Sequence, residues 1–325
     1  MKTAAVVAGA AAVTAFVGRS QEGRDYGPDA SPVIYPDPDI VSVTPALDLY
    51  RIGNSAIQFL WTGGLWLKGA AWNGVGRFFL WSDIRNDRQH RWLEDNGEVS
   101  VFRSPSGYSN GSTSDWEDRK ISCQHGRRQI VRYEHDGTPR LSTPTAGSGS
   151  RTRRTEPRRS AAMRAIPARF TPARGLPHRS LRPGRARHGR VRRPERTVLL
   201  GRLYAALRRR PWGRRKDHQG LDIVDETSLA NMRVFTDVDV DGTKAGPDAV
   251  RSDIDGNVWA TVTWTGYVYI GVHCFTPEGE RIGHIKLPKT TANLIFGGPK
   301  RNRLMITASQ SIYVDYVNTR GAHIT

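Results

Sequence analysis

The sequence predicts an all-β protein, and specifically a six-bladed β-propeller. Short apolar and aromatic runs alternate with turn dipeptides such as Asn96-Gly97, Asp136-Gly137 and Asp255-Gly256. These are strong hairpin signals, because both central residues of the favoured turn need a positive φ. Helical periodicity is nowhere sustained. A repeat of about 40 residues is typical of propeller blades, and the chain has room for roughly six of them.

The first 46 residues precede the blades. Lys2, an apolar stretch over 4–17 and Arg19 have the order of a secretory signal, so residues 1–20 indicate a periplasmic or secreted protein. An Ala-rich tail on a cytoplasmic protein is the alternative. The stretch is too short for a membrane anchor. Residues 21–46 are rich in Pro, Asp and Gly and predict an extended lead-in, after which 47–140 read as N-terminal blades.

Nearly all of the net charge of +18 lies in one Arg/Pro-rich tract, residues 141–220. From 151 to 220 the chain has 22 Arg and one Lys against three acidic residues, so the remainder is near neutral. A basic nucleic-acid-binding arm, a disordered linker and coding sequence read in the wrong frame are the three interpretations. The tract lacks interleaved aromatic residues and any known nucleic-acid motif, which argues against a nucleic-acid partner. Residues 221–325 read as C-terminal blades.

An acidic run, 237–242, has the spacing of a calcium-binding EF-hand loop, with Asp248 at its twelfth position. Nothing on either side is helical, and Lys244 stands where an apolar residue is expected. We therefore expect an acidic β-hairpin turn.

Residues 33–140 and 231–325 resemble the bacterial branch of the regucalcin/gluconolactonase family, which includes senescence marker protein and luciferin-regenerating enzyme-like proteins. The motifs that carry the resemblance are Phe79-Leu80-Trp81-Ser82-Asp83-Ile84, Cys123-Gln124-His125-Gly126, Asp255-Gly256-Asn257-Val258-Trp259 and the run 293–304. The resemblance implies a six-bladed propeller that hydrolyses a sugar-acid lactone to a hydroxy acid, as a monomer or dimer.

The resemblance also implies a divalent cation, Ca²⁺, Mg²⁺ or Zn²⁺, held by a Glu, an Asn and an Asp. The position of the Glu is occupied by Lys68, and an ammonium group cannot coordinate a cation. The Asn stretch would fall in the Arg/Pro-rich tract. We therefore assign no metal ligand. The function implied by the resemblance is metal-dependent lactone hydrolysis, with a rate near background for the chain as written, and a catalytically dead scaffold or a basic polyanion-binding protein is the alternative.

The wrong-frame interpretation of the tract follows from the same resemblance. Read from the second base of each codon, with synonymous codons left free, residues 172–181, 194–204 and 206–211 can all encode family-like strings in the family's order. Three matches in one frame favour misread coding sequence over an arm or a linker. Asp225 is then a loop residue beside the lost Asp ligand.

The resemblance points to three site residues. Asn110 and His125 are expected to bind substrate, and Asp248 is expected to be catalytic. Turn capping by Asn110 and Asp248 and a buried structural role for His125 are the alternatives. Four tryptophans are expected to pack between blades, although one could stack on a sugar ring: Trp66, Trp72, Trp81 and Trp92.

Overall fold

The computed structural model describes residues 24–27, 29–115, 117–141, 197–200, 205–209, 217–223, 229–237, 239–240, 243–244, 246–263 and 269–322. The signal-like segment 1–20 and most of the Arg/Pro-rich tract, 142–196, lie outside these ranges. In the parts described, no helix is both long and apolar enough to cross a membrane.

Five antiparallel sheets of four or five strands follow one another along the chain. The first contains β3 (Leu67–Asn73), β4 (Phe78–Asp83), β5 (Arg88–Leu93) and β6 (Val99–Arg103). The second contains β7 (Ser109–Ser114), β8 (Lys120–Gln124), β9 (Gln129–Tyr133) and β10 (Pro139–Leu141), and the third contains β11 (Thr197–Leu200), β12 (Ala205–Arg209), β13 (Asp217–Ile223) and β14 (Leu229–Asp237). The fourth contains β17 (Gly246–Ser252), β18 (Val258–Thr263), β19 (Gly271–Phe275) and β20 (Arg281–Lys286), and the fifth contains β21 (Thr291–Gly297), β22 (Arg303–Ala308) and β23 (Ser311–Tyr316).

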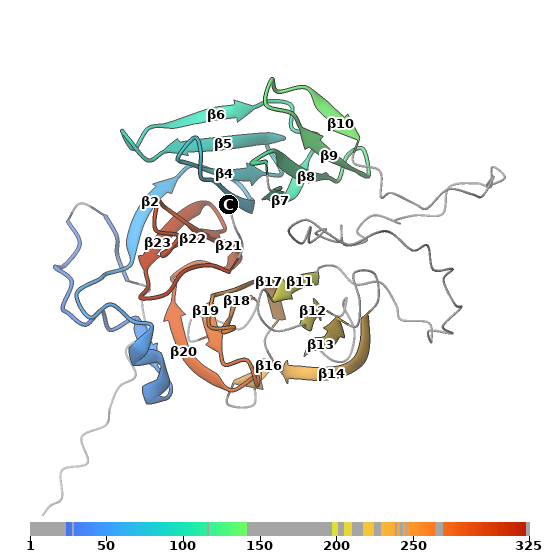
Figure 1. Ribbon diagram of the computed structural model, residues 1–325. Helices are drawn as coiled ribbons and strands as arrows, with labels where there is room; N and C mark the ends of the chain where they lie inside the picture. The colour runs from blue at the N-terminus through green and yellow to red at the C-terminus, as the bar shows by residue number, and fades with distance from the viewer. Residues whose placement is uncertain are drawn as a thin grey trace, which may run out of the picture.

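The sheets are arranged as blades around a common centre (Figure 1), and a β-propeller has its central channel there. The first strand of each blade lies at the inner edge of its sheet, and β3 contacts both β7 and β21, while β21 also contacts β17. The predicted all-β propeller is confirmed. In this arrangement the inner strands supply the side chains that face the channel.

Two strands near the N-terminus complete blades formed near the C-terminus. β2 (Gln58–Thr62) pairs with β23, and β1 (Ile40–Ser42) pairs with β20. The 3-10 helix η1 (Pro45–Leu49) connects them. Asp37 holds this lead-in in place, because its buried carboxylate accepts hydrogen bonds from Arg24 at 2.7 Å and from the Ile57 amide at 3.0 Å.

The blades pack through alternating large side chains. Phe79 and Trp81 lie on one face of β4 with ring centroids 5.3 Å apart, and both are fully buried. The prediction that the tryptophans pack between blades is confirmed for Trp72, Trp81 and Trp92. Trp66 is the exception, with 41% of its surface exposed.

The end of the Arg/Pro-rich tract forms part of a blade. β11, β12 and the start of β13 lie within 141–220 and pair in a continuous ladder, with Thr197 opposite Arg208 and Leu207 opposite Gly220. The sequence predicted that about two central blades are replaced or disrupted, and within the tract only β11, β12 and the start of β13 are described as strands, where short runs pair through their backbones. The earlier part of the tract lies outside the described residues.

The acidic run after β14 forms a short β-hairpin. β15 (Asp239–Val240) pairs with β16 (Thr243–Lys244), and Asp248 lies in β17. The predicted hairpin is confirmed, since an EF-hand would need helices on both sides.

Two buried histidines face each other across β19 and β20. His273 lies directly opposite His284, with ring centroids 4.1 Å apart. Their Nε2 atoms donate to the carbonyl oxygens of Tyr269 at 3.0 Å and Ile270 at 3.2 Å. Burial lowers the pKa of His273 to about 4 and that of His284 to about 2. Both imidazoles are therefore neutral in the folded protein at pH 7.

This pair predicts loss of stability in acid. Below pH 6.5 the unfolded chain binds protons that the folded chain excludes, so the free energy of unfolding falls as pH falls from 6.5 toward 4. His284→Gln keeps an amide donor for the Ile270 carbonyl but has no titrating group. Between pH 7 and pH 4 the free energy of unfolding of this variant should therefore fall by roughly 3 kcal/mol less than that of the wild type. Urea unfolding between pH 7 and 4 tests this, with the exposed His135→Gln as the control. Parallel curves for wild type and His284→Gln would contradict the prediction.

Candidate functional site at the channel mouth

The inner strands β3, β7, β17 and β21 each carry a β-bulge, and two of the predicted site residues, Asn110 and Asp248, lie at these bulges. The register shifts fall between Lys68 and Ala71 in β3, between 109 and 112 in β7, between 247 and 250 in β17, and between 291 and 293 in β21. A bulge turns side chains out of the regular alternation and is common beside functional sites. Here the bulges direct Lys68, Asn110 and Asp248 to the channel.

Gly69 makes the bulge in β3 possible. Its φ is +64°, and a Cβ at this position would lie 1.9 Å from the backbone oxygen of Asn110. No other residue fits so close to β7. Lys68 is therefore fixed next to the strand that carries Asn110.

Lys68 and Asp248 form a buried ion pair across the channel. The Lys68 Nζ contacts the Asp248 Oδ2, and the side chains are only 10% and 11% exposed. The two residues come from β3 and β17, which are separated in the ring by β21. At the bulge, the amide of Ala249 donates to Thr261 Oγ1 at 2.8 Å, which holds the backbone beside Asp248. Because both charges are removed from water, each depends on the other.

Asn110 and His125 form a second contact in the adjacent blade. The Asn110 Nδ2 lies 3.3 Å from the His125 Nε2. His125 is exposed, so its interpretation as a buried structural histidine is wrong. Within the part of the chain described, the buried Asn110 Oδ1 accepts no hydrogen bond. Leaving such an oxygen unsatisfied costs about 1 to 3 kcal/mol, which a water or a ligand hydroxyl would recover.

These residues do not fit a divalent cation. Among the described residues, no group of three His, Cys, Asp or Glu side chains is placed to hold a metal ion. At the position of the expected Glu, the Lys68 ammonium contacts the carboxylate of Asp248. This contact places a positive charge where a cation would have to bind.

Lys120, which no sequence signal indicated, is buried between the first two blades. Its Nζ contacts the Gln89 Oε1 and lies 5.1 Å from the Phe102 ring and 5.3 Å from the Tyr133 ring. Burial, and then the nearby Arg103, hold the pKa of Lys120 well below its usual range. The residue does not face the channel, and its contacts indicate a structural role.

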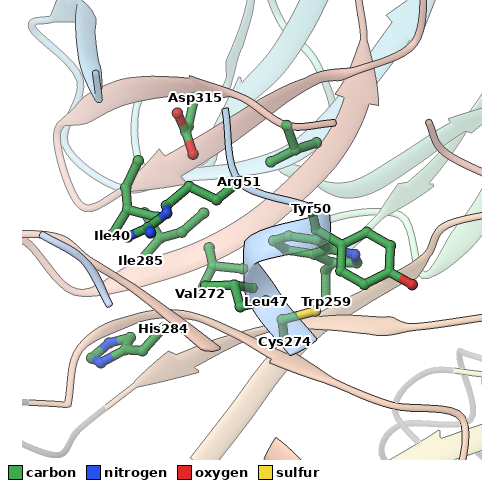
Figure 2. Close-up of a pocket in the computed structure, with 11 residues that line it drawn as sticks. Ile40, Leu47, Tyr50, Arg51, Trp259, Val272, Cys274, His284, Ile285 and Asp315 are labelled. Atoms are coloured by element: carbon green, nitrogen blue, oxygen red, sulfur yellow. The ribbon is translucent and has the colours of Figure 1, made fainter. Parts of the chain in front are cut away.

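A small cavity lies away from the channel, where η1, β20 and β23 meet (Figure 2). Apolar side chains such as Leu47 and Val272 line it, together with Asp315 and Arg51. Burial raises the pKa of Asp315 to about 7, and Ser55 Oγ donates to its carboxylate at 3.2 Å. The cavity has room for about one water molecule, which is too little for a substrate.

Comparisons with known proteins support this picture. Residues 218–310 match the sequence profile of the SMP-30/gluconolactonase/LRE-like region. This segment of the chain is therefore similar to that family. The matched segment includes Asp248 and Asn257 and ends just before Ser311. The family resemblance predicted from the sequence is therefore confirmed over the C-terminal blades. None of the curated proteins compared with the chain matches it.

Three solved structures share the fold of this chain over most of its length. A gluconolactonase from Xanthomonas campestris is 22% identical with a TM-score of 0.66, and the match covers 90% of this chain and 99% of that one. A second protein, assigned as a gluconolactonase, is 21% identical with a TM-score of 0.65 and coverage of 88% and 100%. The calcium-binding protein regucalcin from Agrobacterium tumefaciens is 12% identical with a TM-score of 0.52 and coverage of 82% and 96%.

The ion pair predicts a large coupling between Lys68 and Asp248. Lys68→Met removes the ammonium that contacts the buried Asp248 carboxylate and should lower the free energy of unfolding by about 3 kcal/mol or more. Adding Asp248→Asn should recover most of this loss, since no buried charge then remains. A double-mutant cycle measured by urea unfolding tests the coupling. Strictly additive effects of the two substitutions would show that the side chains do not interact.

Proposed function

We propose that the channel mouth binds a small polar ligand, a sugar-acid lactone or its hydroxy acid, without metal-dependent turnover. The protein then keeps the ligand class of a gluconolactonase-like propeller but not its metal chemistry. The observation that carries this proposal is the Lys68–Asp248 ion pair, which occupies the position of the expected cation ligand.

The polar groups at the mouth suit such a ligand. The Lys68 ammonium is a hydrogen-bond donor for a carbonyl or carboxylate oxygen, and Asp248 is an acceptor for hydroxyl groups. Asn110 offers its buried side-chain oxygen to a further hydroxyl. A polyhydroxylated lactone or acid carries both kinds of partner, whereas an apolar ligand carries neither.

The ammonium also opposes a cation. At 4 Å separation and an effective dielectric of about 20, the repulsion between unit charges is roughly 4 kcal/mol, close to three decades in affinity. A divalent ion is repelled more strongly still. We therefore expect lactone hydrolysis near the background rate.

The rival function is metal-dependent lactone hydrolysis, as suggested by the gluconolactonases and the calcium-binding regucalcin among the similar structures. Calorimetry with Ca²⁺, Mg²⁺ and Zn²⁺, together with pH-stat assays of gluconolactone, separates the two. Weak cation binding and background hydrolysis support the proposal. Hydrolysis that a chelator abolishes would establish the rival.

Lys68→Glu should convert the ion pair into two carboxylates that face each other across the channel. Such a pair attracts a cation, so Ca²⁺ affinity should rise by about a hundredfold or more over wild type. Hydrolysis should stay near background, because the expected Asn ligand is missing. Calorimetry on wild type, Lys68→Glu and the neutral control Lys68→Gln measures the effect. Equal affinities in Lys68→Glu and Lys68→Gln would contradict it.

A further inference from the structure

Trp66 differs from the other tryptophans of the first blade because its indole is open to solvent. It is 41% exposed, whereas Trp72 is 1% and Trp81 is 0% exposed. It lies two residues before Lys68, and the Lys68 Nζ is 6.0 Å from the centroid of the indole ring. An exposed aromatic face thus borders the ion pair at the channel mouth.

The turn that carries Trp66 is held rigidly. The fully buried Asp83 carboxylate accepts the amides of Leu65 at 3.0 Å and Trp66 at 3.1 Å, and also the Asn86 side chain at 2.7 Å. The Trp66 carbonyl accepts the amide of Ile84 at 3.2 Å. With its backbone bonded on both sides, Trp66 pays little ordering cost when a ligand stacks on it.

A second cation flanks the indole. The guanidinium of Arg85 lies 5.5 Å from the centroid of the Trp66 ring. No carboxylate in the described residues is within salt-bridge distance of Arg85, so its charge is not neutralised there. Arg85 and Lys68 together place two positive groups around one exposed aromatic face.

We propose that Trp66 is the platform for a sugar ring that carries a carboxylate, such as a hexuronic acid or the lactone of a sugar diacid. The inference rests on the proposed function and narrows its ligand class. The C–H face of the ring stacks on the indole of Trp66. The carboxylate binds the Arg85 guanidinium and the Lys68 ammonium, and the ring hydroxyls reach Asp248 and Asn110. An open-chain acid lacks the ring, and a neutral sugar lacks the carboxylate.

Three probes separate these requirements: glucuronate has a ring and a carboxylate, glucose has only the ring, and gluconate has only the carboxylate. Calorimetry on the full chain should give glucuronate an affinity about tenfold or more above each of the others. Trp66→Leu should lose about tenfold for glucuronate, and Trp66→Phe should retain most of the affinity. Arg85→Gln should weaken glucuronate and leave glucose unchanged.

The exposed Leu49→Ala serves as the matched control, and thermal melts verify that each variant is folded. Glucuronate affinity within twofold of wild type in Trp66→Leu, or equal affinities for glucuronate and gluconate in wild type, would overturn the platform while leaving the proposed function in place. Failure of the wild-type chain to bind gluconolactone, gluconate or glucuronate would overturn the proposed function itself.

Discussion

Closure of the ring is the constraint on which the rest of the structure depends. The last blade has only three strands of its own, and β2 supplies the fourth by pairing Gln58 with Val314 and Thr62 with Ser311. Without β2, the outer edge of β23 would be unpaired, and sheet proteins avoid such open edges. Asp37 supports the closure, since its contacts with Arg24 and the Ile57 amide fix the segment that leads into β2. By joining the segment before the first blade to the last blade, this pairing holds β3 beside β21.

Within that ring, one ion pair decides the chemistry of the channel. Lys68 and Asp248 lie 180 positions apart in sequence and on inner strands that are not neighbours. Bulges at both positions turn the side chains toward each other, and Gly69 allows the close approach of β7 that the bulge in β3 needs. A buried ion pair stabilises little when compared with apolar residues, but breaking it is costly. Its clearest consequence is therefore functional, since it places an ammonium at the channel mouth.

Much of the fold could be predicted from local signals, because a hairpin is specified by adjacent residues. Asp-Gly turns and apolar alternation identified the all-β class, and the buried rings of Phe79 and Trp81 follow from period-two alternation. The strands β11 and β12 were not predicted, because Arg and Pro obscure the short apolar runs of the tract. The family resemblance indicated Lys68, Asn110 and Asp248. Their partners could not be predicted, because contacts between blades join residues far apart and bulges shift the register without a distinct sequence signal.

The exposure of Trp66 could not be predicted from the sequence either, and this exposed side chain is where we propose that the ligand stacks. Trp66 lies just before β3 and Trp72 lies within it, and Trp66 is 41% exposed while Trp72 is buried, because the turn held by Asp83 lies outside the sheet. Sequence alternation cannot distinguish them.

The Lys68 ammonium brings three directional hydrogen-bond donors to the mouth, where a divalent cation would instead act as a Lewis acid. Such donors recognise a carboxylate better than they activate an ester. Beside a fixed aromatic face and a second cation, the charge at Lys68 therefore suits the acidic sugar ring that we propose as the ligand.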